Sequence, residues 1–399
     1  MHIGQDTGAR VAVAVSRDED AAEAGRAVGL AVRSQLGEAA DLAFLFFSSH
    51  YANQAETLCA ALRSEFSSRI LLGGTGEGVI AGAEEIEDAA AVTLWAARLP
   101  NTQLTPLRLA FPQGADGFAI KGWPESLGVK AERQTIILLA DPFTTPIDEV
   151  LSFMADRCPG AAAIGGLVGG GQDLGDNRLL LNDEVYDGGL VGVALSGGVA
   201  VRTVVSQGCR PIGASYVVTK AEQNVIHELG GSSALDRLQA VFESLAGEER
   251  QIAHRALHLG VVIDEHREQF GRGDFLVRNL IGADRGSGSV AIGDRVQEGQ
   301  TVQFHLRDAQ SASEDLSLLL AADRAKHRKP PLGALLFSCC GRGQALFGRA
   351  NHDITTVRDR EGDIPIAGFF AQGEIGPVGG SNFLHGYTAS LALFSEPDA

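Results

Sequence analysis

One pattern of elements occurs three times along the chain, and this repetition constrains the fold more than any other feature of the sequence. Each copy begins with a hydrophobic segment typical of a buried strand, continues into a helix, and then reaches an apolar strand that runs into a glycine-rich turn. The three copies begin at residues 42–47 (LAFLFF), 136–141 (IILLAD) and 333–339 (GALLFSC). The unit is too long for a stacked solenoid, so it indicates internal duplication inside globular domains.

The glycine-rich turns and the strands that follow them predict how the copies pack. The turns are ILLGGTGEGVI at 70–80, AAAIGGLVGGG at 161–171 and IPIAGFFAQGEIGP at 364–377. The return strands, at 87–97, 186–195 and 385–394, are apolar on both faces and should be covered on both. We therefore predict an α/β fold of strand–helix–strand–strand units, with mixed sheets and outer helices, for which a stacked αββα arrangement is one solution. Packing of the copies should bring their strand ends and turns around shared clefts, where ligands usually bind.

The length of 399 residues indicates two domains. The clearest boundary follows a predicted polar helix at 221–231, which ends in two glycines. The predicted domains are residues 1–230 and 231–399. Beyond the boundary, helices are expected at 232–246, with Ser232 or Ser233 as N-cap, and at 248–257.

Charge and cysteine usage exclude several classes of protein. The net charge of −17 argues against a nucleic-acid partner and against an anionic membrane surface. The five cysteines imply no disulfide framework, and no apolar run reaches the length of a membrane span. No signal peptide is expected at the N-terminus, so the predicted location is the cytoplasm.

The sequence offers no recognisable catalytic, metal or cofactor motif. GGTGEG at 73–78 lacks the GxGxxG spacing and is followed by a predicted strand, so no helix dipole is available for a phosphate. No Ser/His/Asp arrangement with recognisable context is present. The pair His254 and His258 lacks the glutamate of a zinc-binding helix. No catalytic residue, metal site or cofactor is predicted.

Two acidic residues and one thiol are the remaining candidates. Glu77 and Glu374 are flanked by glycines at what we interpret as matching places in two copies. Each carboxylate could bind a ligand amine or merely fix its turn. Cys339 precedes Arg342, whose charge could lower the pKa of the thiol, although a buried, inert cysteine is the common alternative. We expect Cys339 to be the most functionally exposed of the five thiols, and therefore more readily labelled than Cys59 and Cys158, which should pack inside helices.

Three groups of segments resemble the FIST family, with its N-terminal and C-terminal FIST domains. They are ILLGGTGEGVI with EDAAAVTLWAA, AAAIGGLVGGG with YDGGLVGVAL, and FSCCGRG with IAGFFAQGEIGPVGG and HGYTASLALF. The resemblance extends from about residue 11 to residue 394, and the C-terminal group is the most specific. It implies a sensory or signalling module that binds small ligands such as amino acids or related metabolites and acts on an unidentified partner protein. It implies no catalytic residues.

The segments that match CxGRG and GEIG are our predicted ligand neighbourhood. With Glu77, the predicted site residues are Cys339, Gly341, Arg342, Gly343, Gly373, Glu374 and Gly376. In this hypothesis Glu374 binds the amine of a small polar metabolite and Arg342 binds its acid. Two alternatives stay open: a thiol-dependent enzyme that uses Cys339, and a protein-interaction scaffold.

Overall fold

The computed structural model describes residues 8–37, 39–114, 117–128, 134–267, 270–271, 273–327 and 329–397. The chain forms two compact units, one of Met1–Val205 with Leu319–Ala399 and one of Ser206–Leu318. This grouping differs from the predicted division between residues 230 and 231. The first unit contains all three repeats, because the third repeat returns to the first two after the second unit.

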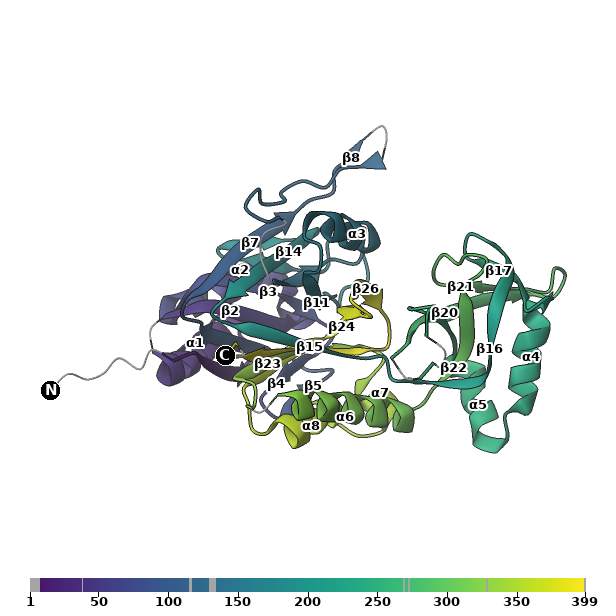
Figure 1. Cartoon of the computed structure of the whole chain (residues 1–399). Helices are drawn as coiled ribbons and strands as arrows, with labels where there is room; N and C mark the ends of the chain where they lie inside the picture. Colours follow the sequence, from purple (N-terminus) through teal and green to yellow (C-terminus); the bar gives the residue numbers. More distant parts are fainter. Residues whose placement is uncertain are drawn as a thin grey trace. The chain divides into compact units, whose positions relative to one another are not determined.

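The first unit contains three six-stranded sheets, each with the same order of strands (Figure 1). The first sheet runs β1 (Arg10–Ser16), β6 (Val92–Arg98), β2 (Ala39–Ser48), β3 (Ser67–Gly76), β12 (Leu179–Leu181) and β13 (Glu184–Tyr186). The second runs β7 (Thr102–Leu109), β14 (Leu190–Gly197), β10 (Thr135–Ala140), β11 (Ala162–Leu167), β25 (Gly373–Val378) and β26 (Ser381–His385). The third runs β15 (Ala200–Ser206), β27 (Ala389–Ser395), β23 (Gly333–Cys339), β24 (Ile366–Ala371), β4 (Val79–Ala81) and β5 (Glu84–Ile86).

Every sheet is completed by a hairpin from a different repeat. The two central strands of each sheet are parallel, and the return strand pairs antiparallel with the first of them. The hairpin of the first repeat pairs with β24 of the third, that of the second with β3, and that of the third with β11. No repeat holds a complete sheet of its own within the described residues, so the three must fold together. The predicted α/β class, with mixed sheets, is confirmed.

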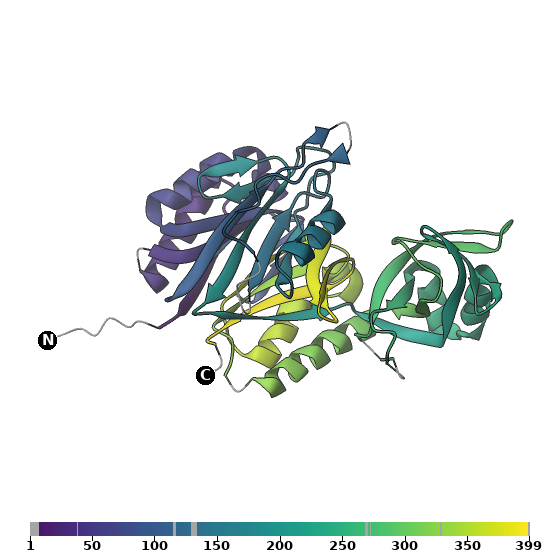
Figure 2. The same cartoon turned by 45° about the horizontal axis from the view of Figure 1, so that its top comes forward.

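Helices cover the outer faces of the sheets, and those that follow the first strand of a repeat connect it to its parallel neighbour. They are α1 (Ala21–Leu36), α2 (Ala55–Glu65), α3 (Ile147–Arg157), α6 (Ala309–Lys326), α7 (Gly343–Phe347) and α8 (His352–Glu361), with a 3-10 turn at Ser49–Gln54. The Asp20 carboxylate caps α1 by accepting hydrogen bonds from the N–H groups of Ala22 and Glu23. The apolar faces of α1 and α2 pack on the first sheet (Figure 2). A short pair of strands, β8 (Gln113–Gly114) and β9 (Gly117–Phe118), stands apart from the three sheets.

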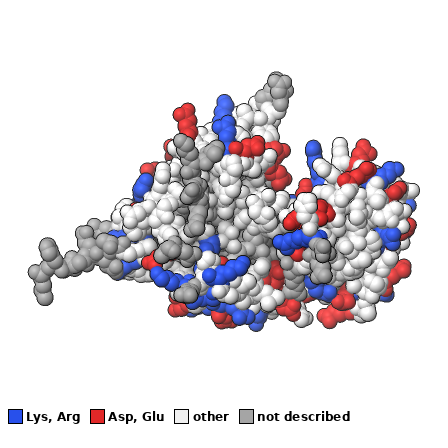
Figure 3. All heavy atoms as spheres, in the orientation of Figure 1, with Lys and Arg blue, Asp and Glu red and all other residues white. Residues whose placement is uncertain are grey.

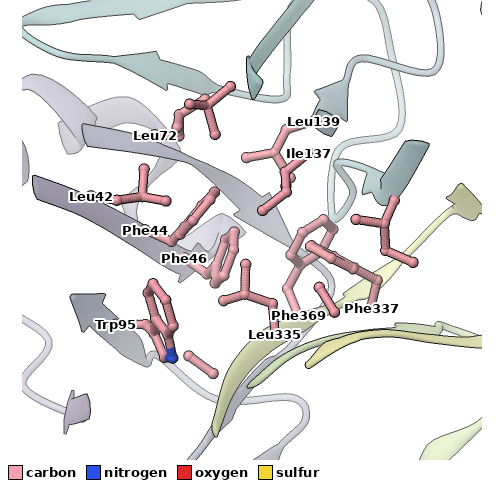
Figure 4. Packing of buried hydrophobic residues seen from close by; sticks show 14 of the residues in the cluster. Leu42, Phe44, Phe46, Leu72, Trp95, Ile137, Leu139, Leu335, Phe337 and Phe369 are labelled. Atoms are coloured by element: carbon pink, nitrogen blue, oxygen red, sulfur yellow. The ribbon is translucent and has the colours of Figure 1, made fainter. Parts of the chain in front are cut away.

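The central core of this unit collects the inward faces of all three sheets. In Figure 4 the rings of Phe46, Phe337 and Phe369 lie against one another, with centroids 5.1 to 6.2 Å apart. Leu139 of the second repeat belongs to the same cluster. Alternate residues of β2, such as Leu45, face α1 and α2 instead. Both faces of the central strands are therefore buried, which explains their unbroken hydrophobic sequences.

One glycine in each repeat shows that the three backbones are equivalent. An added Cβ would lie 1.7 to 2.1 Å from a carbonyl oxygen of the neighbouring parallel strand. The three pairs are Gly73 with Leu45, Gly165 with Leu138 and Gly368 with Leu336. These positions align the repeats residue by residue.

Within its described residues, the second unit forms a seven-stranded sheet with helices α4 and α5, and it also contains the first part of α6, which continues into the first unit. Its elements are β16 (Cys209–Glu222), β17 (Val225–Leu229), β18 (Ser232–Ser233), α4 (Ala234–Ser244), α5 (Gly247–Ala256), β19 (Leu257–Val262), β20 (Phe275–Asp284), β21 (Ser289–Ile292) and β22 (Thr301–Arg307). The predicted helix at 221–231 is wrong. Gln223 turns the chain with a φ of 54°, and β17 then pairs with β16, so sheet pairing overrides local helix preference. The next predicted helix is confirmed as α4, with the Ser233 hydroxyl accepting from the Asp236 N–H.

Candidate functional site

The glycine-rich turns of the three repeats meet at the carboxyl ends of the parallel strands. Three hydrogen bonds of 3.1 Å join the turns in a cycle, each from an N–H of one repeat to a carbonyl of another. The pairs are Gly169 to Thr75, Glu77 to Phe370 and Gln372 to Leu167. In open α/β folds, ligands bind outside the carboxyl ends of parallel strands, so this junction is a candidate binding region.

The side chain at the end of the first strand of each repeat accepts hydrogen bonds from backbone N–H groups. These equivalent residues are Ser48, Asp141 and Cys339. The Asp141 carboxylate accepts from two N–H groups at 3.0 and 3.1 Å, and the Ser48 hydroxyl accepts from Ala91 N–H at 3.1 Å. The Cys339 sulfur likewise accepts from Gly341 N–H at 3.5 Å. The thiol therefore occupies a position that two other polar side chains fill elsewhere.

Glu374 replaces an aliphatic residue of the other two repeats. Its structural equivalents are Val79 and Leu179, because each of the three pairs with the residue that directly follows the equivalent glycine of the neighbouring strand. All three side chains are completely buried. The Glu374 Oε2 accepts from Thr388 N–H at 2.9 Å, whereas Oε1 has no hydrogen-bond partner in the described part of the chain. Burial raises the pKa of this carboxyl well above its ordinary value, and the neighbouring Cys339 raises it further.

This alignment corrects the interpretation that Glu77 and Glu374 occupy matching places. Glu77 is equivalent to Gln372, two residues before Glu374, as the cycle of hydrogen bonds requires. Glu77 is exposed, and Glu374 is fully buried. The two carboxylates are thus at different depths of the same junction, and both lie close enough to Cys340 to raise the pKa of its thiol.

Arg342 is buried and already paired. Its guanidinium donates to both carboxylate oxygens of Asp353, at 2.7 and 2.8 Å, and both side chains are inaccessible to solvent. The pairing holds the pKa of Asp353 well below its ordinary range, against the effect of burial. The expected contact of Arg342 with a ligand carboxylate is not supported, because Asp353 fills its bidentate face.

Cys340, not Cys339, is the exposed thiol. A hydrogen bond with the Cys339 thiol lowers the pKa of Cys340, and the same interaction, followed by burial, raises the pKa of Cys339. The expectation that Cys339 is the most exposed thiol is therefore wrong. Cys59 and Cys158 are buried as expected, Cys59 within α2 and Cys158 at the end of α3.

The four predicted glycines all belong to the third repeat: Gly341 and Gly343 follow β23, and Gly373 and Gly376 lie in β25. Gly373 and Gly376 are buried, and an added Cβ would meet Leu167 in one case and Val205 in the other. Gly343 has a φ of 60° and packs against Glu87, whose carboxylate accepts from Gln344 N–H. Close packing accounts for these three glycines. Gly341 contacts Cys339 as described above.

Sequence reasoning missed the partners around Arg342. Glu85 of β5 is buried, accepts from Ile354 N–H at 2.7 Å, and its burial beside Asp353 raises the pKa of its carboxyl to about 7. His352 contacts Asp353 and stacks on Phe347. Asp353, an acidic residue in the first turn of α8, was the available signal, but nothing in the sequence assigned it to Arg342.

Two hollows in the structure are lined by other residues. A hollow of about 620 Å³ in the second unit is lined by residues that include Leu238, Phe242 and His254. A smaller one of about 260 Å³ lies along α8. Neither is lined by a predicted site residue. Within the described ranges, no group of three or more His, Cys, Asp or Glu side chains could hold a metal ion.

The fold and this junction define a class: an α/β protein with three interlocked repeats, of which the third carries a buried cluster of thiol, carboxylate and guanidinium groups. The FIST N domain matches residues 41–232, and the FIST C domain matches residues 234–377. The chain therefore belongs to the FIST family. FIST domains are associated with sensing in signal transduction. The two family matches meet between residues 232 and 234, near the predicted domain boundary. The compact units divide instead at the two ends of Ser206–Leu318.

Two mycobacterial proteins are similar over nearly the whole chain. The uncharacterised protein MT0656 of Mycobacterium tuberculosis is 42% identical over 388 residues, which cover 97% of this chain and 100% of the relative. The uncharacterised protein Mb0898c of Mycobacterium bovis is 42% identical over 390 residues, covering 97% of this chain and 99% of the relative. In the described part of the chain, none of the helices has the length and hydropathy that a membrane crossing requires. Acidic and basic side chains are interspersed on the face in Figure 3.

Proposed function

We propose that this protein is a sensor that binds a small amine-bearing metabolite, such as an amino acid, at the junction of the three turns. The observation that carries the proposal is Glu374, a fully buried carboxyl with an oxygen unpaired among the described residues, where the other repeats have Val79 and Leu179. An unsatisfied buried polar group costs about 1–3 kcal/mol. A group that lowers stability at a position where valine suffices is explained by a functional role.

The charge of the junction favours a cation over an anion. Glu77 and Glu87 stand beside Cys340 and Gln344, and neither carboxylate has an ion-pair partner among the described residues. Arg342, the cation that the turn itself carries, is neutralised by Asp353. An ammonium group at this junction would supply the missing positive charge.

Access to the junction begins at its exposed side chains. Glu77, Gln372 and Cys340 are exposed, and each comes directly after a strand or turn of the repeats. We assign first contact with the amine to Glu77. Glu374, buried beside Cys339, would respond to the added charge through its raised pKa.

The alternative of an enzyme that uses Cys339 has weaker support. Cys339 is only 6% exposed, and the raised pKa of its thiol disfavours the nucleophilic thiolate. The scaffold alternative has no specific observation in its favour among the described residues. Ligand binding therefore remains the leading proposal.

The test is a calorimetric and thermal-unfolding screen of amino acids and simple amines, with the corresponding deaminated acids as matched compounds. Amines should raise the midpoint of unfolding, and the deaminated compounds should not, because only the amines carry the ammonium. A ligand at a concentration about 100 times its dissociation constant stabilises a fold by about 2.7 kcal/mol. Glu77→Gln should weaken binding by about 1.5–3 kcal/mol, the contribution of a hydrogen bond to a charged group.

The matched control is Glu56→Gln, an exposed glutamate on α2. This variant removes the same charge from the molecule but leaves the junction intact, so it should bind like the wild type. Equal binding by the Glu77 and Glu56 variants, or no amine that shifts the wild type, would contradict the assignment.

A further inference from the structure

The third repeat ends its first strand with two adjacent thiols, Cys339 and Cys340. Cys339 N–H donates to Thr388 O and Cys340 N–H donates to Ala371 O, both at 2.9 Å. The backbone of each cysteine is therefore held by a different neighbouring segment of the third sheet. One thiol is buried and its neighbour is exposed. The corresponding residues are Ser48-Ser49 and Asp141-Pro142 in the other repeats, so the dithiol is a feature of this copy alone.

The two thiols interact with each other and differ in acidity. Their mutual hydrogen bond is the main cause of opposite shifts, since it lowers the pKa of Cys340 and raises the pKa of Cys339. The exposed sulfur is therefore the one that becomes a thiolate, and the buried sulfur keeps its proton. This is the arrangement of an attacking thiol beside a resolving thiol.

A third group completes the cluster. Glu374 lies beside the Cys339 thiol, is fully buried, and has no hydrogen-bond partner for Oε1 among the residues described. The Glu374 carboxyl interacts with the Cys339 thiol, and both side chains are buried, so the carboxyl is placed to pass a proton to and from this thiol.

We propose that Cys339 and Cys340 form a reversible disulfide within the chain when the protein meets a hydroperoxide. This proposal goes beyond amine binding and does not depend on it. It rests on the adjacency of the two thiols, on their unequal exposure, and on the unpaired oxygen of Glu374 beside them.

The chemistry balances in two steps. The Cys340 thiolate attacks the outer oxygen of the hydroperoxide, which breaks the O–O bond, releases an alkoxide and leaves Cys340 as a sulfenic acid. The Cys339 sulfur then attacks the sulfenic sulfur, and the S–S bond forms as the S–O bond breaks. The leaving hydroxide takes a proton from the Glu374 carboxyl, which regains it from the Cys339 thiol, so that water departs. A dithiol reductant reverses the change by two thiol–disulfide exchanges and is itself oxidised to a disulfide.

The geometry makes this disulfide labile and coupled to the rest of the repeat. Adjacent Cα atoms are about 3.8 Å apart, less than the roughly 4.4–6.8 Å usual across a disulfide, so the ring is strained. Strained disulfides are readily reduced and suit regulation. The ring would also alter the turn that holds Gly341 against Cys339 and Arg342 against Asp353. Oxidation would thereby change the contacts of α8, which begins at His352 and carries Asp353.

The experiment treats the full chain with one equivalent of hydrogen peroxide and measures intact mass and peptide maps. The expected product has lost two hydrogen atoms, contains one peptide with both cysteines linked, and returns to the starting mass with dithiothreitol. Before oxidation, a maleimide should label Cys340 ahead of the other four thiols. Cys340→Ser should lose both the disulfide and the rapid labelling.

Two further variants separate the steps. In Cys339→Ser the reaction should stop at a Cys340 sulfenic acid, which a dimedone probe captures. If this variant does not fold, Glu374→Gln supplies the readout, since slower proton transfer should let the same adduct accumulate. Cys59→Ser is the control and should oxidise like the wild type. A wild-type product with Cys340 in a disulfide between chains, a stable sulfenic or sulfinic acid at Cys340, or no reaction at either cysteine would overturn the proposal.

Discussion

The first and third repeats share a backbone but differ in chemistry at the ends of their strands. Where the first repeat has Ser48 and Val79, the third has Cys339 and Glu374, and all four side chains are buried. Three residues beyond the strand end, the first repeat has the buried Tyr51 and the third has the buried Arg342.

This difference separates what the fold requires from what the site requires. Val79 and Leu179 show that the hairpin position needs only an aliphatic side chain. Transfer of a carboxyl or a guanidinium into a core is costly, so the fold alone does not account for either group in the third repeat. The glycine of the second strand, by contrast, is common to all three repeats.

The largest expected effect tests the shared backbone. Gly73→Ala, Gly165→Ala and Gly368→Ala should each destabilise the protein by more than the roughly 1–3 kcal/mol typical of overpacking, because the clash is with main chain that no side-chain rotation relieves. Urea unfolding of the three variants measures this. Gly386→Ala is the control, since its Cβ would meet nothing within 4 Å. If the variant of one repeat has the same free energy of unfolding as the control, the three backbones are not equivalent at this position.

The next effect tests the buried ion pair of the third repeat. Arg342→Ala should cost about 3–5 kcal/mol, because it leaves the Asp353 carboxylate buried without its partner. Arg358 lies on α8, the helix that carries Asp353, and forms an exposed ion pair with Asp363 just beyond the end of that helix. Arg358→Ala should cost about 0–1 kcal/mol. Denaturant unfolding at neutral pH compares the two. Similar losses would show that Arg342 does not act as the anchor of the turn.

The smallest effect concerns pH and sharpens the contrast between Val79 and Glu374. The raised pKa means that folded Glu374 holds a proton that the unfolded chain has released, so stability should fall as pH rises from the ordinary value of 4.5 through the folded pKa. A tenfold difference in proton affinity between the folded and unfolded chain corresponds to about 1.4 kcal/mol of stability. Glu374→Gln should remove this part of the pH dependence, which denaturant unfolding at a series of pH values measures.

Glu85 provides the comparison within the same experiment. Its folded pKa of about 7 gives a loss of the same sign that is complete just above neutral pH. In Glu374→Gln, the remaining fall of the unfolding free energy with pH should therefore end near that pH. Glu56→Gln should show the same dependence of the unfolding free energy on pH as the wild type. A wild-type slope in Glu374→Gln would mean that the carboxyl ionises freely in the folded protein.

Much of the fold could be predicted from local pattern. Unbroken apolar strands and glycine-rich turns located the three repeats, and the Ser233 cap located α4. The exchange of hairpins between repeats could not be predicted, since β4 pairs with β24 although the paired residues are 286 to 290 positions apart in the sequence. The predicted helix at 221–231 failed because a local hairpin with β16, joined by β21, decided its conformation.

Less of the candidate site could be predicted. The segment around Cys339 and Glu374 stays a predicted ligand neighbourhood. The offset of Glu77 by two residues depends on a register that only the paired strands reveal. Which of two adjacent thiols is exposed depends on the direction of the chain as it leaves β23. The partner of Arg342 lies on a helix that carries no sign of the pairing in its sequence.

The sequence by itself determined the repeated unit, because hydrophobic runs and glycines act through local conformation and burial that each copy specifies alone. The sequence also shows that the third copy carries Cys339, Cys340 and Glu374, but only the tertiary structure decided which of these groups are buried and which are exposed. Pairing between distant strands sets the depth of Glu374, whereas Arg342 pairs with Asp353 only eleven residues further along the chain. Cys340 remains exposed directly after β23. Burial and charge pairing are properties of neighbours in space, and it is these that set the pKa of each group at the junction.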